Sequence, residues 1–144
     1  MTNRSTIPDN YFQTQQFKVV FPKHLNSNGT FFGGEAMQWL DEVAFITATR
    51  YSRQRMITVK ISNIHFLKPI LPDTILEIVG KIVKIGNVKL FIKVEVFSEE
   101  MYSQNRKKMI EADFVFASCN DALAPIPLQH NPVTLCHDQR ENET

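Results

Sequence analysis

Residues 34–53 read GEAMQWLDEVAFITATRYSR, and the apolar residues among them recur at helical spacing. At about 100° per residue, one side of the predicted helix is apolar and the opposite side is polar. The apolar side is formed by Met37, Leu40, Ala44, Ala48 and Tyr51, with Ala36, Val43 and Phe45 at its margins. The polar side is formed by Glu35, Gln38, Glu42 and Thr49. Such a broad apolar sector predicts that other parts of the chain cover most of this helix.

The residues around this helix predict a sheet and no second helix. Five segments are predicted as strands: residues 17–21, 56–67, 74–85, 88–97 and 110–116. The alternation of apolar and polar residues is cleanest in residues 88–97. A change of face near Asn63 indicates a bulge. Gly86-Asn87 is typical of a two-residue hairpin turn, because both positions tolerate positive φ.

One helix against five antiparallel strands is buried best when the sheet curls round it. Gly80, inside a predicted strand, permits close approach or curvature. We therefore expect an α+β fold in one domain, with a long central helix wrapped by a curved five-stranded antiparallel sheet. This domain is predicted to span residues 16–119, after an N-terminal segment of residues 1–15 and before a polar, poorly ordered tail of residues 120–144.

The composition limits the kinds of partner. The chain has 144 residues, of which 43% are hydrophobic, and its 16 Lys and Arg residues nearly balance its 15 Asp and Glu residues. Because this balance supplies no basic field, nucleic acid is not expected as the main partner. The sequence has neither an apolar run typical of a signal peptide nor the roughly 18 apolar residues of a membrane span, so we expect a cytoplasmic protein.

The cysteines do not predict a metal site. Cys119 and Cys136 are the only two, and without a secretory signal two thiols are more often free than paired. Combined with His130 and His137, their spacing matches no zinc pattern. We therefore expect neither a metal nor a cofactor.

Asp41 does not fit a simple amphipathic helix. It lies about 40° round the helix from Met37, so the sequence predicts a carboxylate on the buried side. An ionised carboxylate there needs hydrogen bonds or a polar cavity, and such placements concentrate where acid or base chemistry is done. The alternative is a structural aspartate that neighbouring groups satisfy.

The segment NSNGTFFGG, residues 26–34, immediately precedes the helix. Glycines at a helix start let a ligand approach the backbone, and the N–H groups of the first turn have no partner within the helix. Such groups can polarise a carbonyl, and losing one oxyanion donor typically costs about 10² to 10³ in rate. The alternative is that Gly33 and Gly34 serve packing alone.

Other nucleophiles are not favoured. No Ser lies in a Gly-x-Ser-x-Gly turn, and neither Cys lies near a helix start. His24, near the glycine loop, could assist catalysis, but a loop histidine is more often a solvated or turn residue. His65 is interpreted as a residue of the sheet.

The spacing Asn-x-x-Gly-x-x-Phe-Gly-Gly-x-x-Met-x-x-x-Asp, from Asn26 to Asp41, resembles that of the hotdog acyl-CoA thioesterases of the broad-specificity bacterial and brain acyl-CoA hydrolase type. Residues 64–69, IHFLKP, are similar to the strand end Phe-Leu-x-Pro of this family. Residues 73–80 look like its next strand, and residues 85–96 look like its glycine hairpin and long strand. The resemblance covers about residues 15–118.

The resemblance implies a hotdog fold, a homodimer that joins two sheets, and often a hexamer built as a trimer of dimers. It also implies hydrolysis of acyl-CoA to a carboxylic acid and CoA, at a site between protomers. In this interpretation Asp41 activates water or attacks the thioester, and Asn26 acts with it from the partner subunit. Gly33 and Gly34 would bind the thioester oxygen.

Further residues are expected to bind the substrate: Phe32, Phe66, Lys68, Gly86, Asn87 and Lys89. Lys68 and Lys89 would meet the CoA phosphates at the mouth of the groove, whereas the alternative is that they are solvated strand lysines. Many relatives carry Ser or Thr in this hairpin, so Gly86-Asn87-Val88-Lys89 departs from the family pattern.

Two alternative functions stay open. A dehydratase or hydratase of the same fold would need a histidine paired with an acid, and His24 is the candidate. A non-catalytic acyl-CoA-binding regulator would normally carry a fused domain, and the sixteen residues before Phe17 are too short for a helix-turn-helix. A pure binder would need neither Asn26 nor Asp41.

Overall fold

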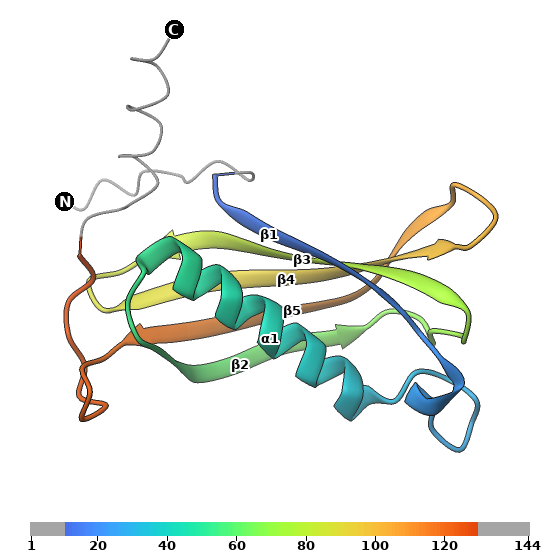
Figure 1. The fold of residues 1–144 in the computed structure, drawn as a ribbon, viewed down its shortest axis with the longest axis horizontal. Coiled ribbons are helices and arrows are strands. Elements are labelled where there is room, and N and C mark those ends of the chain that lie inside the picture. Colours follow the sequence, from blue (N-terminus) through green and yellow to red (C-terminus); the bar gives the residue numbers. More distant parts are fainter. Residues whose placement is uncertain (1–10, 130–144) are drawn as a thin grey trace, which may run out of the picture.

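The computed structural model describes residues 11–129, so Cys136 and the predicted tail beyond position 129 lie outside the described residues. The elements in chain order are β1 (Gln13–Val19), η1 (Pro22–His24), α1 (Gly33–Ser52), β2 (Met56–Phe66), β3 (Thr74–Ile85), β4 (Lys89–Glu100) and β5 (Arg106–Ser118). The five strands form one antiparallel sheet in the order β1-β3-β4-β5-β2, and α1 lies across one face of it (Figure 1). The predicted α+β fold is confirmed. Among residues 11–129, no helix is long and apolar enough to cross a membrane.

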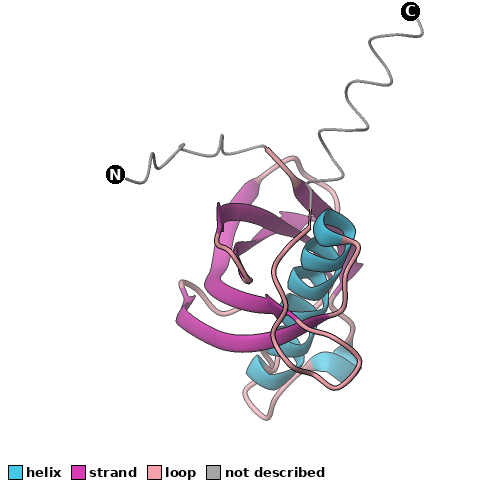
Figure 2. Ribbon diagram, turned by 90° about the vertical axis from the view of Figure 1, so that its left-hand side faces the viewer, coloured by secondary structure: helices cyan, strands magenta, loops and turns pink. Residues whose placement is uncertain are grey.

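The core lies between α1 and the concave face of the sheet, which curls round the helix (Figure 2). Alternate residues of β4 point into this core: Leu90, Ile92, Val94 and Val96 are each at most 1% exposed. The predicted period-two pattern of this strand is thereby confirmed. Gly80 of β3 faces the helix, since a Cβ atom added there would lie 2.5 Å from Thr47 Oγ1 and 3.2 Å from Val43 Cγ1.

The bulge predicted near Asn63 is present in β2. The register between β2 and β5 shifts between Ser62 and His65, and Asn63 has a φ of 52°. The turn between β3 and β4 also forms, but by a different geometry from the one predicted. Gly86 N–H donates to Lys89 O at 2.8 Å, and neither Gly86 nor Asn87 has a positive φ. The turn therefore does not use positive φ, the property on which its prediction rested.

Both ends of the folded unit extend further than the sequence indicated. β1 begins at Gln13, within the segment expected to precede the domain, and Tyr11 and Phe12 pack against the core. Beyond Ser118, the chain returns along the sheet: Ile126 N–H donates to Ser118 O, and Leu128 N–H donates to Asn87 O. The first part of the expected polar tail is thus fixed to the sheet and its β3–β4 turn, because backbone N–H groups of the tail donate hydrogen bonds to them.

The convex face of the sheet carries paired charges. Arg106 donates to both carboxylate oxygens of Glu77, at 3.2 and 3.1 Å, and its guanidinium stacks on a phenylalanine ring. This hydrogen bonding holds the pKa of Glu77 below its usual value. At Glu95 burial raises the pKa, but ion pairs with Lys108 and Lys81 outweigh it, and the pKa is lowered. These acids therefore stay ionised although they are largely covered.

β2 is an edge strand with an apolar flank. Five apolar residues in and just after it are between 37% and 51% exposed: Val59, Ile61, Ile64, Phe66 and Leu67. An exposed edge strand of this kind is a template for pairing with another chain.

Candidate active site

Asp41 lies in the third turn of α1, at the boundary of the buried side rather than on it. The helix buries a side centred on Ala36, Leu40 and Val43, and Asp41 follows Leu40 by about 100° of rotation. Asp41 is half-buried, and Phe45, one turn further on, is 47% exposed. The prediction of a buried carboxylate is therefore wrong for the protomer, because the sheet ends at β2 and leaves this flank of the helix open.

A hydroxyl on β2 contacts this carboxylate. Thr58 Oγ1 lies 3.2 Å from Asp41 Oδ1 and donates to it, so the strand that follows α1 orients the side chain. No pattern in the sequence points to Thr58, whose side chain is exposed in the protomer.

Asn26 shapes the loop before α1 through its own side chain. Its Oδ1 accepts from Asn28 N–H at 2.8 Å and from Thr30 N–H at 3.2 Å, while its Nδ2 donates to Thr30 Oγ1 at 3.0 Å. The backbone closes the same loop, since Asn26 N–H donates to Thr30 O. Within one protomer, Asn26 therefore acts as a loop-closing residue.

The first turn of α1 presents backbone donors that no side chain caps. Phe32 is the N-cap residue and makes no side-chain hydrogen bond to the helix. The first bond within the helix runs from Ala36 N–H to Phe32 O at 3.0 Å. The N–H groups of Gly33, Gly34 and Glu35 precede this bond, so they have no partner within the helix and point along its axis.

Gly33 and Gly34, at this helix start, differ in how much space an added Cβ atom would have. A Cβ atom at Gly34 would lie 2.7 Å from the ring of Phe32, so this exposed side chain would have to move aside. At Gly33 the nearest atom would be Phe66 Cζ at an ordinary 3.8 Å. Packing therefore does not require glycine at position 33, and its backbone stays open to an incoming group.

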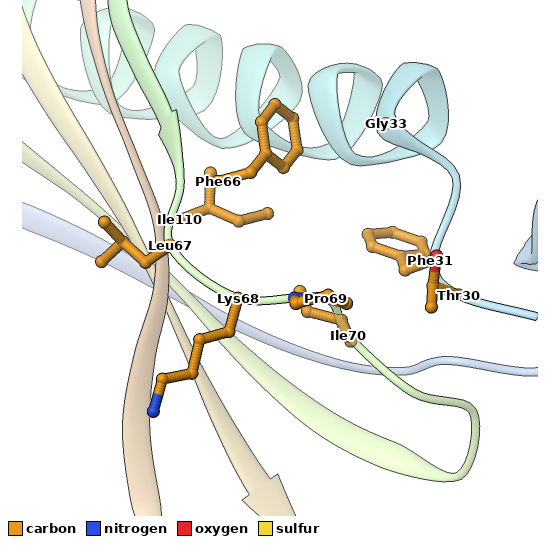
Figure 3. A pocket seen from close by; sticks show the side chains of 9 residues that line it. All are labelled: Thr30, Phe31, Gly33, Phe66, Leu67, Lys68, Pro69, Ile70 and Ile110. Atoms are coloured by element: carbon orange, nitrogen blue, oxygen red, sulfur yellow. The ribbon is translucent and has the colours of Figure 1, made fainter. Parts of the chain in front are cut away.

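A pocket of about 320 Å³ opens beside Gly33 (Figure 3). It is lined by Thr30, Phe31, Gly33, Phe66, Leu67, Lys68, Pro69, Ile70 and Ile110. The Phe66 ring points toward α1, whereas Lys68 extends away from the helix (Figure 3). Three of the predicted substrate-binding residues thus meet at one pocket. No pattern in the sequence distinguishes the pocket residue Ile70 from an ordinary core residue.

Of the other predicted substrate-binding residues, Phe32 and Gly34 lie at the start of α1. Gly86, Asn87 and Lys89 lie at the far end of the sheet. Lys89 pairs with Ala117 on β5, whereas the pocket residue Ile110 pairs with Val96. Ala117 lies seven positions further along β5 than Ile110, so the two residues are about 24 Å apart. The β3–β4 turn with Gly86 and Asn87 therefore does not reach the pocket of its own protomer (Figure 1).

His24 has an acidic neighbour, Glu35 on α1. Its Nε2 lies 4.0 Å from Glu35 Oε1, which is an ion-pair distance but too long for a hydrogen bond. The side chain is 12% exposed, and its ring lies edge-on to Trp39 with centroids 5.0 Å apart. His24 is thus a packed loop residue rather than a solvated one.

The fold is that of a hotdog-fold thioesterase. A hexameric thioesterase from Yersinia pestis superposes with a TM-score of 0.75 at 25% identity, covering 90% of this chain and 99% of that one. A hexameric hotdog fold thioesterase of Campylobacter jejuni, at 22% identity, has the same fold with a TM-score of 0.72, covering 79% of this chain and 88% of that one. The family model of the thioesterase superfamily matches residues 28–103, and the chain belongs to this superfamily.

Curated relatives extend the match over most of the chain. An uncharacterized acyl-CoA thioester hydrolase of Haemophilus influenzae is 30% identical over 118 residues, which are 78% of this chain and 77% of the relative. The acyl-CoA thioester hydrolase YciA of Salmonella typhimurium is 28% identical over 76% of this chain and 85% of its own length. A Bacillus subtilis relative is matched over 63% of its length.

Proposed function

We propose that this chain hydrolyses acyl-CoA thioesters to a carboxylic acid and CoA. The observation that carries the proposal is the pocket beside Gly33, because it places a largely apolar hollow with Lys68 on its wall next to N–H groups of the first helical turn that have no partner within the helix. The relatives named above are acyl-CoA thioester hydrolases, which supports the substrate class. CoA is then part of the substrate, and the reaction needs no added cofactor. A cytoplasmic location stays a prediction from the sequence.

The chemistry divides between donors and a carboxylate. The thioester oxygen accepts hydrogen bonds from N–H groups at the start of α1, which stabilise the charge that develops on it. Asp41 takes a proton from water, the water oxygen attacks the carbonyl carbon, and the C–S bond breaks to release the CoA thiolate, which is then protonated. In the alternative step, the carboxylate itself attacks the carbonyl carbon, the C–S bond breaks to release the CoA thiolate, and water hydrolyses the resulting anhydride to the carboxylic acid and free Asp41. Thr58 orients Asp41 in both routes.

The site is proposed to be shared between two protomers. The exposed apolar flank of β2 offers an edge where a second sheet can pair, and this pairing would cover Asp41 and Phe45. The β3–β4 turn of the partner would then complete the site, because Lys89 does not approach the pocket of its own protomer. The partner's Asn26 is proposed to act with Asp41. The Yersinia relative is described as hexameric, and we propose a trimer of dimers here.

The test measures release of free CoA from acetyl-, hexanoyl- and palmitoyl-CoA by the wild-type protein, with binding of the same ligands followed in parallel. We expect turnover of at least one chain length. Binding without CoA release from any of them would contradict the proposal and would favour an acyl-CoA-binding regulator.

A further inference from the structure

His24 connects the end of β1 to the start of α1 through three hydrogen bonds. Its N–H donates to Phe21 O at 2.9 Å, and its ring Nδ1 accepts from Phe21 N–H at 3.0 Å. Its carbonyl oxygen accepts from Phe32 N–H at 2.9 Å, and Phe32 is the residue from which α1 begins. The loop that contains Asn26 lies between these two attachments. Of these three bonds, only the one at Nδ1 involves the side chain, so it is the bond that a substitution of His24 can remove.

The surroundings of the ring fix its tautomer. Because Nδ1 accepts a hydrogen bond, a neutral His24 carries its proton on Nε2, which faces Glu35. The ring packs against Trp39 and Phe31, with centroids 5.0 and 6.4 Å away.

The hydrogen bond to Phe21 requires that Nδ1 carries no proton. Protonation would turn Nδ1 into a donor facing the Phe21 N–H, so the hydrogen bond between them would be lost.

We propose that His24 is a positioning residue for the thioesterase site: its neutral ring, through the Nδ1 bond to Phe21, holds residues 21–32 so that Asn26 and the first turn of α1 are correctly placed. The inference rests on the proposed function for its consequence in catalysis. Its structural part, the fixing of the loop by an acceptor at Nδ1, does not.

Two amide variants separate the acceptor from the ring. In His24→Asn the side-chain oxygen can occupy the position of Nδ1 and keep the bond to Phe21, whereas in His24→Gln it reaches the position of Nε2 and the bond is lost. Neither variant titrates in the range of an imidazole. Lys23→Ala, which removes an exposed side chain from the same turn, is the matched control.

At pH 8, we expect His24→Asn to keep kcat within about threefold of wild type and His24→Gln to lose about tenfold or more, mainly in kcat rather than KM. Equal losses in both variants would overturn the inference.

Hydrogen–deuterium exchange of the peptide covering residues 20–33 gives a readout that does not need turnover. His24→Gln should speed exchange at Phe21 and Phe32, whereas His24→Asn and Lys23→Ala should not. If wild type hydrolyses no acyl-CoA but the exchange pattern appears, the proposed function fails and the role of His24 in the loop stands. Exchange that is equal in all variants overturns the role of His24 whatever the activity.

Discussion

The hydroxyl group of Thr58 donates a hydrogen bond to Asp41, the proposed catalytic carboxylate, at 3.2 Å. Thr58→Val keeps the shape of the side chain and removes only this donor. We expect kcat to fall by about tenfold, because the carboxylate loses the group that orients it. Thr58→Ser, which keeps the hydroxyl, should stay near wild type in the same steady-state assay. Equal activity of Thr58→Val and wild type would contradict this role.

Glu77 makes a pH-dependent contribution to stability. Its pKa is lowered in the folded state by hydrogen bonds from Arg106, so its contribution is present above the unfolded pKa of about 4.3 and is lost as the pH falls through the folded value. Glu77→Gln should lower the free energy of unfolding by about 1 kcal/mol at pH 7, because Arg106 is partly exposed. The difference should shrink below about pH 4. Urea titrations at several pH values measure it, and a constant difference would refute the linkage.

For single residues, the sequence singled out candidate residues but did not predict their burial or their contacts. Asp41 stood out because a carboxylate occurs among apolar neighbours, yet its half-buried position depends on where the sheet ends. The interaction of Thr58 with Asp41 joins positions seventeen residues apart and follows from how β2 lies beside α1. No local pattern predicts such a contact. The roles of Asn26, Gly86, Asn87 and Lys89 in catalysis or binding stay predictions.

Contact between α1 and β3 limits residue 80 to glycine. In Gly80→Ala the new methyl would lie 2.5 Å from Thr47 Oγ1, which is itself buried and bonded to Val43 O. We expect the free energy of unfolding to fall by about 1 to 3 kcal/mol, because a packed core has no space for an added methyl group. Adding Thr47→Ala should recover part of this loss by removing the nearest atom. If Gly80→Ala unfolds at the wild-type denaturant midpoint, the tight contact is contradicted.

The elements themselves were largely predictable from the sequence. The helix, the bulge near Asn63 and the strand from Thr74 to Ile85 all follow from the period of their apolar residues. β1 was predicted too short because residues 13–16 are polar, and residues 126–128 were assigned to a tail because single apolar residues show no period. Backbone hydrogen bonds fix both segments, and side-chain patterns do not report such bonds.

The whole molecule is proposed to be an oligomer with shared sites, which permits a complementation test. Asp41→Asn and Asn26→Ala chains should each be inactive alone. After joint refolding, a mixed dimer would contain one site with both residues intact, so random pairing should restore about a quarter of wild-type activity. No recovery, although mixed dimers are present by native mass spectrometry, would mean that Asn26 and Asp41 act within one protomer or not together.

The most direct measurement compares the kcat of wild type and Asp41→Asn for release of CoA from hexanoyl-CoA, at the same oligomeric state by size-exclusion chromatography. The substitution keeps the size of the side chain and leaves Thr58 an acceptor, so the fold should be unchanged. We predict a loss of about 10²-fold or more, because the amide can neither take a proton from water nor attack the thioester. A variant that retains wild-type kcat would contradict Asp41 as the catalytic carboxylate.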